Sequence, residues 1–461
     1  MENFWDYSVW GFVNLMAAML ISLLAANLLK KSIRLLRVSL IPTSVLGGLL
    51  LLAVALIYQA VTGNKFFNTN AFGGNGAAML EIVTYHCLAL GFIATTMKPG
   101  SGKLTRERQT EIFNTGLTTV CTYLLQAVLG LGITIVAARV MDGFFAAAGA
   151  LLPFGYGQGT GQALNYGGIY ENDFGFVGGK SFGLTVACMG FLSASLGGVL
   201  HLNILRRKGR VVFTEKDVTH AINSEQVQGK DEIPMNGSID KMTVQIAIVF
   251  AVYYVAYLLI VLLAQLLPGL KSVLYGFNFL LGVLVATAAK GLLDFLRKKK
   301  IVNKVYVNGF LMNRISAFCF DLMIVAGIGA IRLEFLQSSW HILLILGVSG
   351  MAATYAYVYF ICKKLFADYL EEQFMGMYGM LTGTASTGII LLRELDPDFK
   401  TPVADNMVYQ SFPAMVFGFP IMLLATVAPV APIRTWLIVV AFFAVMNVLL
   451  FRKQLFKKNK A

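Results

Sequence analysis

The chain has 461 residues, of which 57% are hydrophobic and only 13% are charged. With a mean hydropathy of +0.70, this apolar content exceeds what one or two soluble cores require, so an integral membrane protein is indicated and no soluble catalytic domain is left over. The formal net charge is +13, but the lysines and arginines gather in short stretches between apolar runs instead of on one amphipathic face, which argues against a nucleic-acid-binding surface.

Apolar runs long enough to cross a bilayer as helices recur along nearly the whole chain. The first begins after Glu2 and Asp6, without a basic region before it or a small-residue cleavage site after it, so a retained helix is predicted in place of a signal peptide. The predicted crossings, about eleven in all, are 9–29, 40–62, 77–97, 112–141, 177–204, 242–267, 274–296, 305–330, 340–362, 405–430 and 434–451.

The positions of the basic residues predict the topology. By the positive-inside rule the stretches that carry them are cytoplasmic, which places the N-terminus outside. An odd number of crossings then ends inside, in agreement with the basic tail that begins at Arg452. The basic stretches lie at 30–37, 98–108, 206–210, 290–304, 363–364 and 452–460.

Two further segments, about 143–175 and 373–398, are not counted as crossings because each must begin and end on one side. Each contains a glycine-threonine cluster with the pattern G-x-x-x-G-T-small, at 155–161 and at 379–385. Open backbone groups at membrane depth persist only where protein or a polar cavity surrounds them, so both segments are predicted to be re-entrant hairpins that approach the midplane from opposite faces.

The predicted fold is an all-α integral membrane protein built from two inverted repeats, each of five helices and one glycine-rich hairpin, with one extra helix at the C-terminal end. Residues 1–205 form the first repeat and 242–432 the second. Residues 206–241 are rich in charged residues, Asn and Gly, and are predicted to be a flexible cytoplasmic linker. Residues 433–461 hold the extra helix and the basic cytoplasmic tail.

The hairpin tips are the candidate binding site. Half-helices that end in the membrane expose N–H groups to an anion and C=O groups to a cation, and glycine lets the backbone approach a ligand. Small-residue helix packing is the alternative explanation, and a phosphate-binding loop is disfavoured because its lysine is absent. The substrate candidates are Gly157, Gln158, Gly159, Thr160, Gly161, Gln162, Gly383, Thr384, Ser386 and Thr387. The candidate Na⁺ ligands at the tips are Thr160, Thr382 and Thr384.

Ionisable residues inside a bilayer are functional candidates because their burial is costly. Asp321 is a candidate Na⁺ ligand or a partner of Arg314, and Arg393 is either a counter-charge for a substrate carboxylate or an anchor at the membrane surface. Glu81 and His86 are expected to have structural roles. The five cysteines occur singly within apolar runs and are expected to be small core residues.

At these clusters the chain resembles the bacterial sodium/glutamate symporter family. The matching stretches follow the family order and are 41–48, 155–163, 187–198, 376–387 and 412–419. Two positions depart from the family pattern, because Gln158 stands where a histidine is usual and the second cluster lacks the family's proline.

The resemblance implies a homodimer in the bacterial cytoplasmic membrane that carries glutamate inward with Na⁺, with no other cofactor and no enzymatic activity. Residues 157–162 and 382–387 would then surround the substrate and the Na⁺. A Na⁺- or H⁺-coupled carrier of another small carboxylate, such as citrate or malate, is the alternative. An intramembrane enzyme is less favoured, because the four histidines are dispersed along the sequence. A channel is also less favoured and would differ by showing flux without gradient-driven accumulation.

Overall fold

The structure is a computed structural model that describes residues 3–99, 105–209, 232–234, 239–337, 339–397 and 399–455. It is 84% helical, without a strand in these ranges. Ten helices are long and apolar enough to cross a membrane, and an eleventh span is formed by two helices that meet at an angle of 48°. The chain is therefore a multi-pass helical membrane protein, as the apolar runs predicted.

The helices of the first half follow the predicted runs closely. Four of the five predicted crossings begin within three residues of the observed helices, whereas α5 begins earlier than predicted because Thr105 caps it by accepting a hydrogen bond from Arg108 N. The helices are α1 (Tyr7–Ser32), the short α2 (Arg34–Val38), α3 (Thr43–Thr62), α4 (Gly76–Met97), α5 (Arg106–Val140), α6 (Leu151–Phe174) and α7 (Gly179–Arg207).

The second half is also built mainly from long helices. Its last predicted run, 405–430, is divided into two helices at Gln410, and Pro413 follows in the first turn of the second one, where its missing N–H costs no helix bond. The helices are α9 (Lys241–Leu266), α10 (Lys271–Gly276), α11 (Asn278–Lys298), α12 (Gly309–Gly329), α13 (Trp340–Leu365), α14 (Leu370–Thr382), α15 (Ala385–Arg393), α16 (Val403–Tyr409), α17 (Ser411–Val427), α18 (Pro432–Leu450) and α19 (Arg452–Leu455).

The predicted linker lies mostly outside the described residues, which omit 210–231 and 235–238. Its described part is anchored: Glu232 accepts from Lys241 Nζ at 2.7 Å and from Asn308 Nδ2 at 2.8 Å. Asp240 and Asn308 cap the helices α9 and α12. The end of the linker therefore holds the beginnings of two helices of the second half together.

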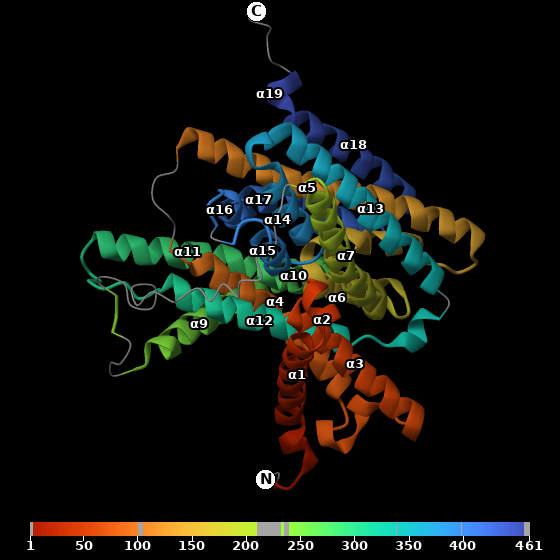
Figure 1. The fold of residues 1–461 in the computed structure, drawn as a ribbon. Coiled ribbons are helices and arrows are strands. Elements are labelled where there is room, and N and C mark those ends of the chain that lie inside the picture. The colour runs from red at the N-terminus through yellow and green to blue at the C-terminus, as the bar shows by residue number, and fades with distance from the viewer. Residues whose placement is uncertain are drawn as a thin grey trace, which may run out of the picture.

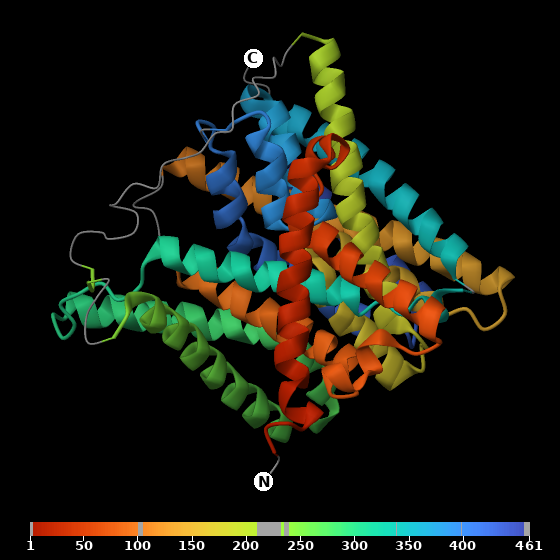
Figure 2. The same ribbon diagram turned by 60° about the horizontal axis from the view of Figure 1, so that its bottom comes forward.

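The helices divide into an inner and an outer group. The most apolar stretches of α7 and α12 are 67% buried within the chain, whereas those of α1, α9 and α18 are only 22% buried. In both views α9 and α13 lie on opposite sides of the molecule with α6 and α7 between them (Figures 1 and 2). The outer helices present apolar side chains outward, as lipid contact requires.

Candidate functional site at the tips of two helical hairpins

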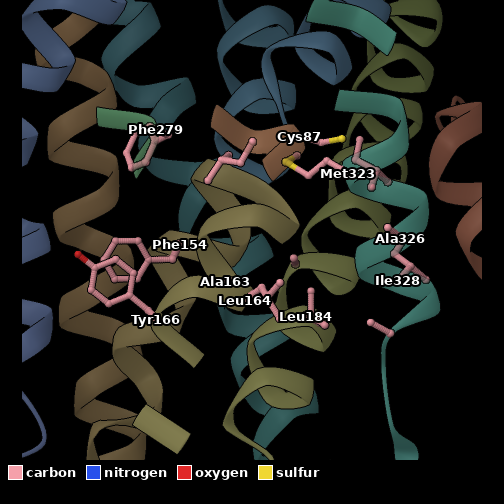
Figure 3. Packing of buried hydrophobic residues seen from close by; sticks show 14 of the residues in the cluster. Cys87, Phe154, Ala163, Leu164, Tyr166, Leu184, Phe279, Met323, Ala326 and Ile328 are labelled. Carbon is pink, nitrogen blue, oxygen red and sulfur yellow. The ribbon is translucent and has the colours of Figure 1, made fainter. Parts of the chain in front are cut away.

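The first glycine-threonine cluster divides α6 into two arms. Gly159 has φ 76° and ψ −167°, a conformation that interrupts the helix between residues 158 and 160 and that glycine adopts without strain. The rings of Phe154 and Tyr166, one on each arm, stack with their centroids 3.9 Å apart (Figure 3). Twelve residues of continuous helix would separate them by about 18 Å, so α6 folds back on itself as a hairpin.

Both arms pack along α7. In the first arm a Cβ on Gly155 would lie 2.8 Å from Ala187 N, and one on Gly159 3.6 Å from the Phe191 ring, so this arm runs parallel to α7. The second arm runs the other way, because Gly167 opposes Gly179. The tip at Gly159 therefore lies against the middle of α7.

The second cluster forms a separate hairpin from α14 and α15. The two helices touch without side chains between them, since a Cβ on Gly379 would lie 2.8 Å from the Gly388 Cα. The α14 arm runs antiparallel to α7. Near the end of α7, the Glu371 carboxylate is hydrogen-bonded to His201 Nε2 at 2.8 Å. Nearer the middle of α7, Tyr378 OH donates to Ser193 O at 2.9 Å. The turn at Gly383 and Thr384 reaches the same level of α7 as the first tip.

The two tips meet. A Cβ on Gly159 would lie 3.1 Å from Thr384 Cγ2 and 3.8 Å from Gly383 O. The Phe191 ring contacts both tips, because a Cβ on Gly383 would lie 3.1 Å from it. Two clusters far apart in the sequence are thus brought together on one helix, which they approach from its opposite ends.

The first tip carries an unpartnered hydrogen-bond donor. Gln162 is completely buried, its Oε1 accepts from Asn165 Nδ2 at 3.3 Å, and its Nε2 has no partner. The second arm of α6 also begins here and turns its free N–H groups toward the tip. Thr160 is held by a 3.1 Å bond from its Oγ1 to Met323 O of α12. Such a group of donors suits a carboxylate.

The second tip carries oxygen acceptors. Thr384 caps α15 by accepting from Thr387 N at 3.4 Å, and the Thr382 hydroxyl donates to Tyr378 O. Gln126 of α5 donates from Nε2 to Leu381 O at 2.9 Å, while its buried Oε1 has no partner. Sequence reasoning missed Gln126; the only signal for it was an amide in the middle of an apolar run. An unpartnered amide oxygen beside hydroxyls and carbonyls suits a cation such as Na⁺.

The tip residues differ in how deeply they are buried. Gln158 and Thr384 are half-buried and Ser386 is exposed. The other predicted tip residues are buried, and these are Gly157, Gly159, Thr160, Gly161, Gln162, Thr382, Gly383 and Thr387. The structure therefore brings the predicted residues of both clusters together and leaves three of them not fully buried.

Two predicted residues lie away from the tips. Arg393 is exposed at the far end of α15, where its guanidinium stacks 5.4 Å from the Phe399 ring centroid. Asp321 lies beside Ser44 of α3, on the opposite face of α12 from Met323 and Gly327, which contact the first tip. The structure thus does not bring either residue to the junction of the hairpins.

The remaining ionisable candidates have structural partners. Glu81 forms ion pairs at 2.8 Å with both Lys180 and Arg332, and so ties α4 to the beginning of α7. His86 is hydrogen-bonded to Tyr253 OH at 2.7 Å. Arg314 lies over the Phe310 ring instead of facing Asp321. Among the described residues, no group of three or more His, Cys, Asp or Glu side chains is arranged to hold a metal ion.

The fold and the tips define a class: a multi-pass helical membrane protein with two helical hairpins that meet at its centre. In comparisons with known proteins, no family model, no curated protein and no solved structure matches the chain.

Proposed function

We propose that the protein is a secondary active transporter that carries L-glutamate, or a closely related amino acid, into the cell by symport with Na⁺. The observation that carries the proposal is the meeting of the two glycine-threonine tips against α7. Paired helix interruptions that meet at a polar centre are the arrangement in which transporters bind their substrates. The resemblance to the sodium/glutamate symporter family supplies the substrate and the ion.

The packing of the helices supports an inverted repeat. In the first half α3 packs on α12, and in the second half its counterpart α11 packs on α4. Likewise α5 packs on α17, and its counterpart α13 packs on α7. Each of these contacts is repeated when the halves are exchanged, as expected of two repeats related by a pseudo-two-fold axis.

The proposed mechanism assigns opposite roles to the two tips. Na⁺ binds to hydroxyl and carbonyl oxygens at the second tip and offsets the charge of the anionic substrate, whose carboxylate accepts from Gln162 and from the N–H groups that begin the second arm of α6. The hairpins and α7 then move relative to the outer helices. Each Na⁺ that enters contributes about 2.3 kcal/mol per 100 mV of membrane potential, which drives accumulation of the substrate.

The proposal includes the setting of the protein. The hairpins are re-entrant from opposite faces of a bacterial cytoplasmic membrane, with the N-terminus outside and the C-terminus in the cytoplasm. The functional unit is a homodimer.

Uptake of labelled L-glutamate into proteoliposomes tests the proposal. An inward Na⁺ gradient is expected to drive accumulation, a K⁺ gradient is not, and Thr160→Ala and Thr384→Ala are expected to reduce uptake strongly. Thr134→Ala is the matched control, because Thr134 is equally buried but bonds to Ala146 O, away from the tips.

Folded protein that accumulates no glutamate would contradict the proposed substrate. Competition and direct uptake with citrate and malate then test the alternative carrier. Unchanged uptake in both tip variants would show that the tips are not part of the binding site.

A further inference from the structure

A second group of unpartnered polar atoms lies away from the tips, where α5, α14 and α16 meet. Gln373 Oε1 and both amide atoms of Asn406 have no hydrogen-bond partner, and both side chains are 0% exposed. Burying a polar group without a hydrogen-bond partner destabilises the folded state. Such atoms in a folded protein usually mark the place of a bound water or ion.

Side chains from three helices converge here. Gln373 Nε2 donates to Thr115 Oγ1 at 3.3 Å, and Thr119 Oγ1 donates to Gln410 Oε1 at 3.0 Å. Thr115 and Thr119 share one face of α5, and Asn406 of α16 lies one helical turn before Gln410, the residue directly after that helix. The close approach of α14 and α16 depends on Gly376, where a Cβ would lie 2.9 Å from Val403 Cγ1.

The chemistry of the cluster is that of a site for a monovalent cation. Amide and hydroxyl oxygens are hard, neutral ligands, whereas divalent cations are usually held with the help of carboxylates. Glu111, one helical turn before Thr115, is already paired with Arg108 at 2.5 Å, so the ligands that the cluster offers are neutral oxygens. The Tyr369 hydroxyl makes side-chain hydrogen-bonding contacts with Glu111 and with Asn406. The contact with Asn406 is longer or more bent than a regular hydrogen bond, so neither amide atom of Asn406 has a full partner.

We propose that Gln373 and Asn406, with the hydroxyl oxygens of Thr115 and Thr119, bind one Na⁺ ion at a site separate from the hairpin tips. The two unpartnered amide oxygens are ligands, and Asn406 Nδ2 donates to a water that completes the shell of the ion. The choice of Na⁺ over other monovalent cations rests on the proposed function. Because Gln373 belongs to α14, the bound ion fastens the second hairpin to α5 and α16.

The test is Na⁺-dependent thermal stabilisation of the purified full-length protein in detergent, without amino acid and with choline replacing Na⁺ at constant ionic strength. The Na⁺ concentration for half-maximal stabilisation is expected to rise about tenfold in Gln373→Met and in Asn406→Leu. Gln245→Met is the control, because Gln245 is equally buried and its amide is bonded to Tyr306 O and to Asn308 N. A wild-type Na⁺ dependence in both test variants overturns the proposal and leaves only water at the cluster.

Asn406→Asp keeps the test decisive if Asn406→Leu does not fold. The aspartate retains an oxygen ligand and adds negative charge, so half-maximal stabilisation is expected at a lower Na⁺ concentration than in the wild type, and an unchanged requirement contradicts the site. Failure of this proposal is separable from failure of the proposed function. If the variants alter the Na⁺-dependent stability but the protein takes up no glutamate, the ion site is supported and the proposed substrate is wrong. If Na⁺ drives glutamate uptake but the variants keep the wild-type Na⁺ dependence, the proposed function is supported and the ion site is wrong.

Discussion

The two hairpins share a sequence pattern but are braced differently. The first turns at the single residue Gly159, and the stacked rings of Phe154 and Tyr166 lie between its arms. The second turns over Gly383 and Thr384, and its arms meet glycine to glycine. The first hairpin is therefore held from within by aromatic packing, whereas the second depends on a close backbone fit and on neighbours such as Gln126.

The largest expected effect comes from filling the glycine contact of the second hairpin. A Cβ on Gly388 would collide with the backbone oxygen of Gly376 and lie 2.5 Å from Met407 Cε. Gly388→Ala is therefore expected to destabilise the protein by about 3 kcal/mol and to abolish uptake. Thermal unfolding and proteoliposome uptake measure both effects.

The matched change in the first hairpin is Gly157→Ala. Its Cβ would collide with the ring of Tyr123, a side chain that can be shortened. The double variant Gly157→Ala with Tyr123→Leu is therefore expected to recover stability that Gly157→Ala alone loses.

For the second hairpin, equal stability of Gly388→Ala and the wild type would show that its two arms are not in close contact.

The next effect separates the donor of the first tip from the acceptor of the second. Gln162→Met is expected to raise the KM for the substrate about tenfold or more. The melting temperature is expected to change little, because the loss of the long 3.3 Å bond from Asn165 Nδ2 is offset by removal of an unpartnered buried donor. Concentration-dependent uptake and thermal unfolding provide the two readings. A lower melting temperature with an unchanged KM would assign Gln162 a purely structural role.

The companion variant Gln126→Met is expected to act on the ion instead of the substrate. It removes an unpartnered oxygen, so the Na⁺ requirement for uptake should rise. It also deletes the bonds from Gln126 Nε2 to Leu381 O and Thr354 Oγ1, so stability should fall. If Gln162→Met and Gln126→Met changed the KM for the substrate and the Na⁺ requirement in the same way, the assignment of the substrate to the first tip and of Na⁺ to the second would be wrong.

A smaller effect on stability is expected at the threonine of each tip. Thr384 caps the helix of its own hairpin, so Thr384→Ala should cost about 1 kcal/mol of stability and Thr384→Ser should restore most of it. Thr160 bonds across to α12 instead, so Thr160→Ser should retain that bond to Met323 O. Thermal unfolding of these three single variants checks this, and a serine as damaging as alanine at position 384 would exclude capping.

The smallest effect concerns the connection after the second hairpin. Burial alone would raise the pKa of Asp396, but hydrogen bonds from Thr401 and Lys400 outweigh it and lower the pKa below its ordinary value. The folded state then gains stability above the unfolded-state pKa of about 4 and loses it as the pH falls through the lower folded-state pKa. Asp396→Asn should therefore reduce the acid-induced fall in melting temperature between pH 5 and pH 3. A pH profile identical to that of the wild type would contradict this.

The sequence predicted the long helices well because hydropathy alone determines them. The runs at 77–97 and 340–362 match α4 and α13 nearly residue for residue. It also predicted the breaks in the two glycine-rich segments, because glycine clusters are rarely placed in apolar helices without a reason, but it did not predict the division of the run 405–430 at Gln410. The residue at which the first helix turns, Gly159, was not distinguishable from its glycine neighbours, since only the tertiary packing selects it.

The parts that escaped prediction depend on which face of a helix is turned inward. Gln126 and Phe191 contact the tips from apolar runs whose pattern gives no direction. Asp321 and Arg393 attracted interest as charges in or near the bilayer, yet one faces Ser44 and the other faces Phe399. Their roles in ion and substrate binding stay predictions, as do the repeat boundaries.

The packing of both hairpins on one helix has a consequence for the dependence on lipid composition. The spacing between the tips is set by contacts along α7, at Ala187, Phe191 and Gly197, and not by the depth to which each hairpin enters the bilayer. A thinner or thicker membrane would tilt the outer helices α1, α9 and α18 without separating the tips. Substrate affinity is therefore expected to be nearly independent of acyl-chain length, and any influence of membrane thickness should fall on the rate of transport.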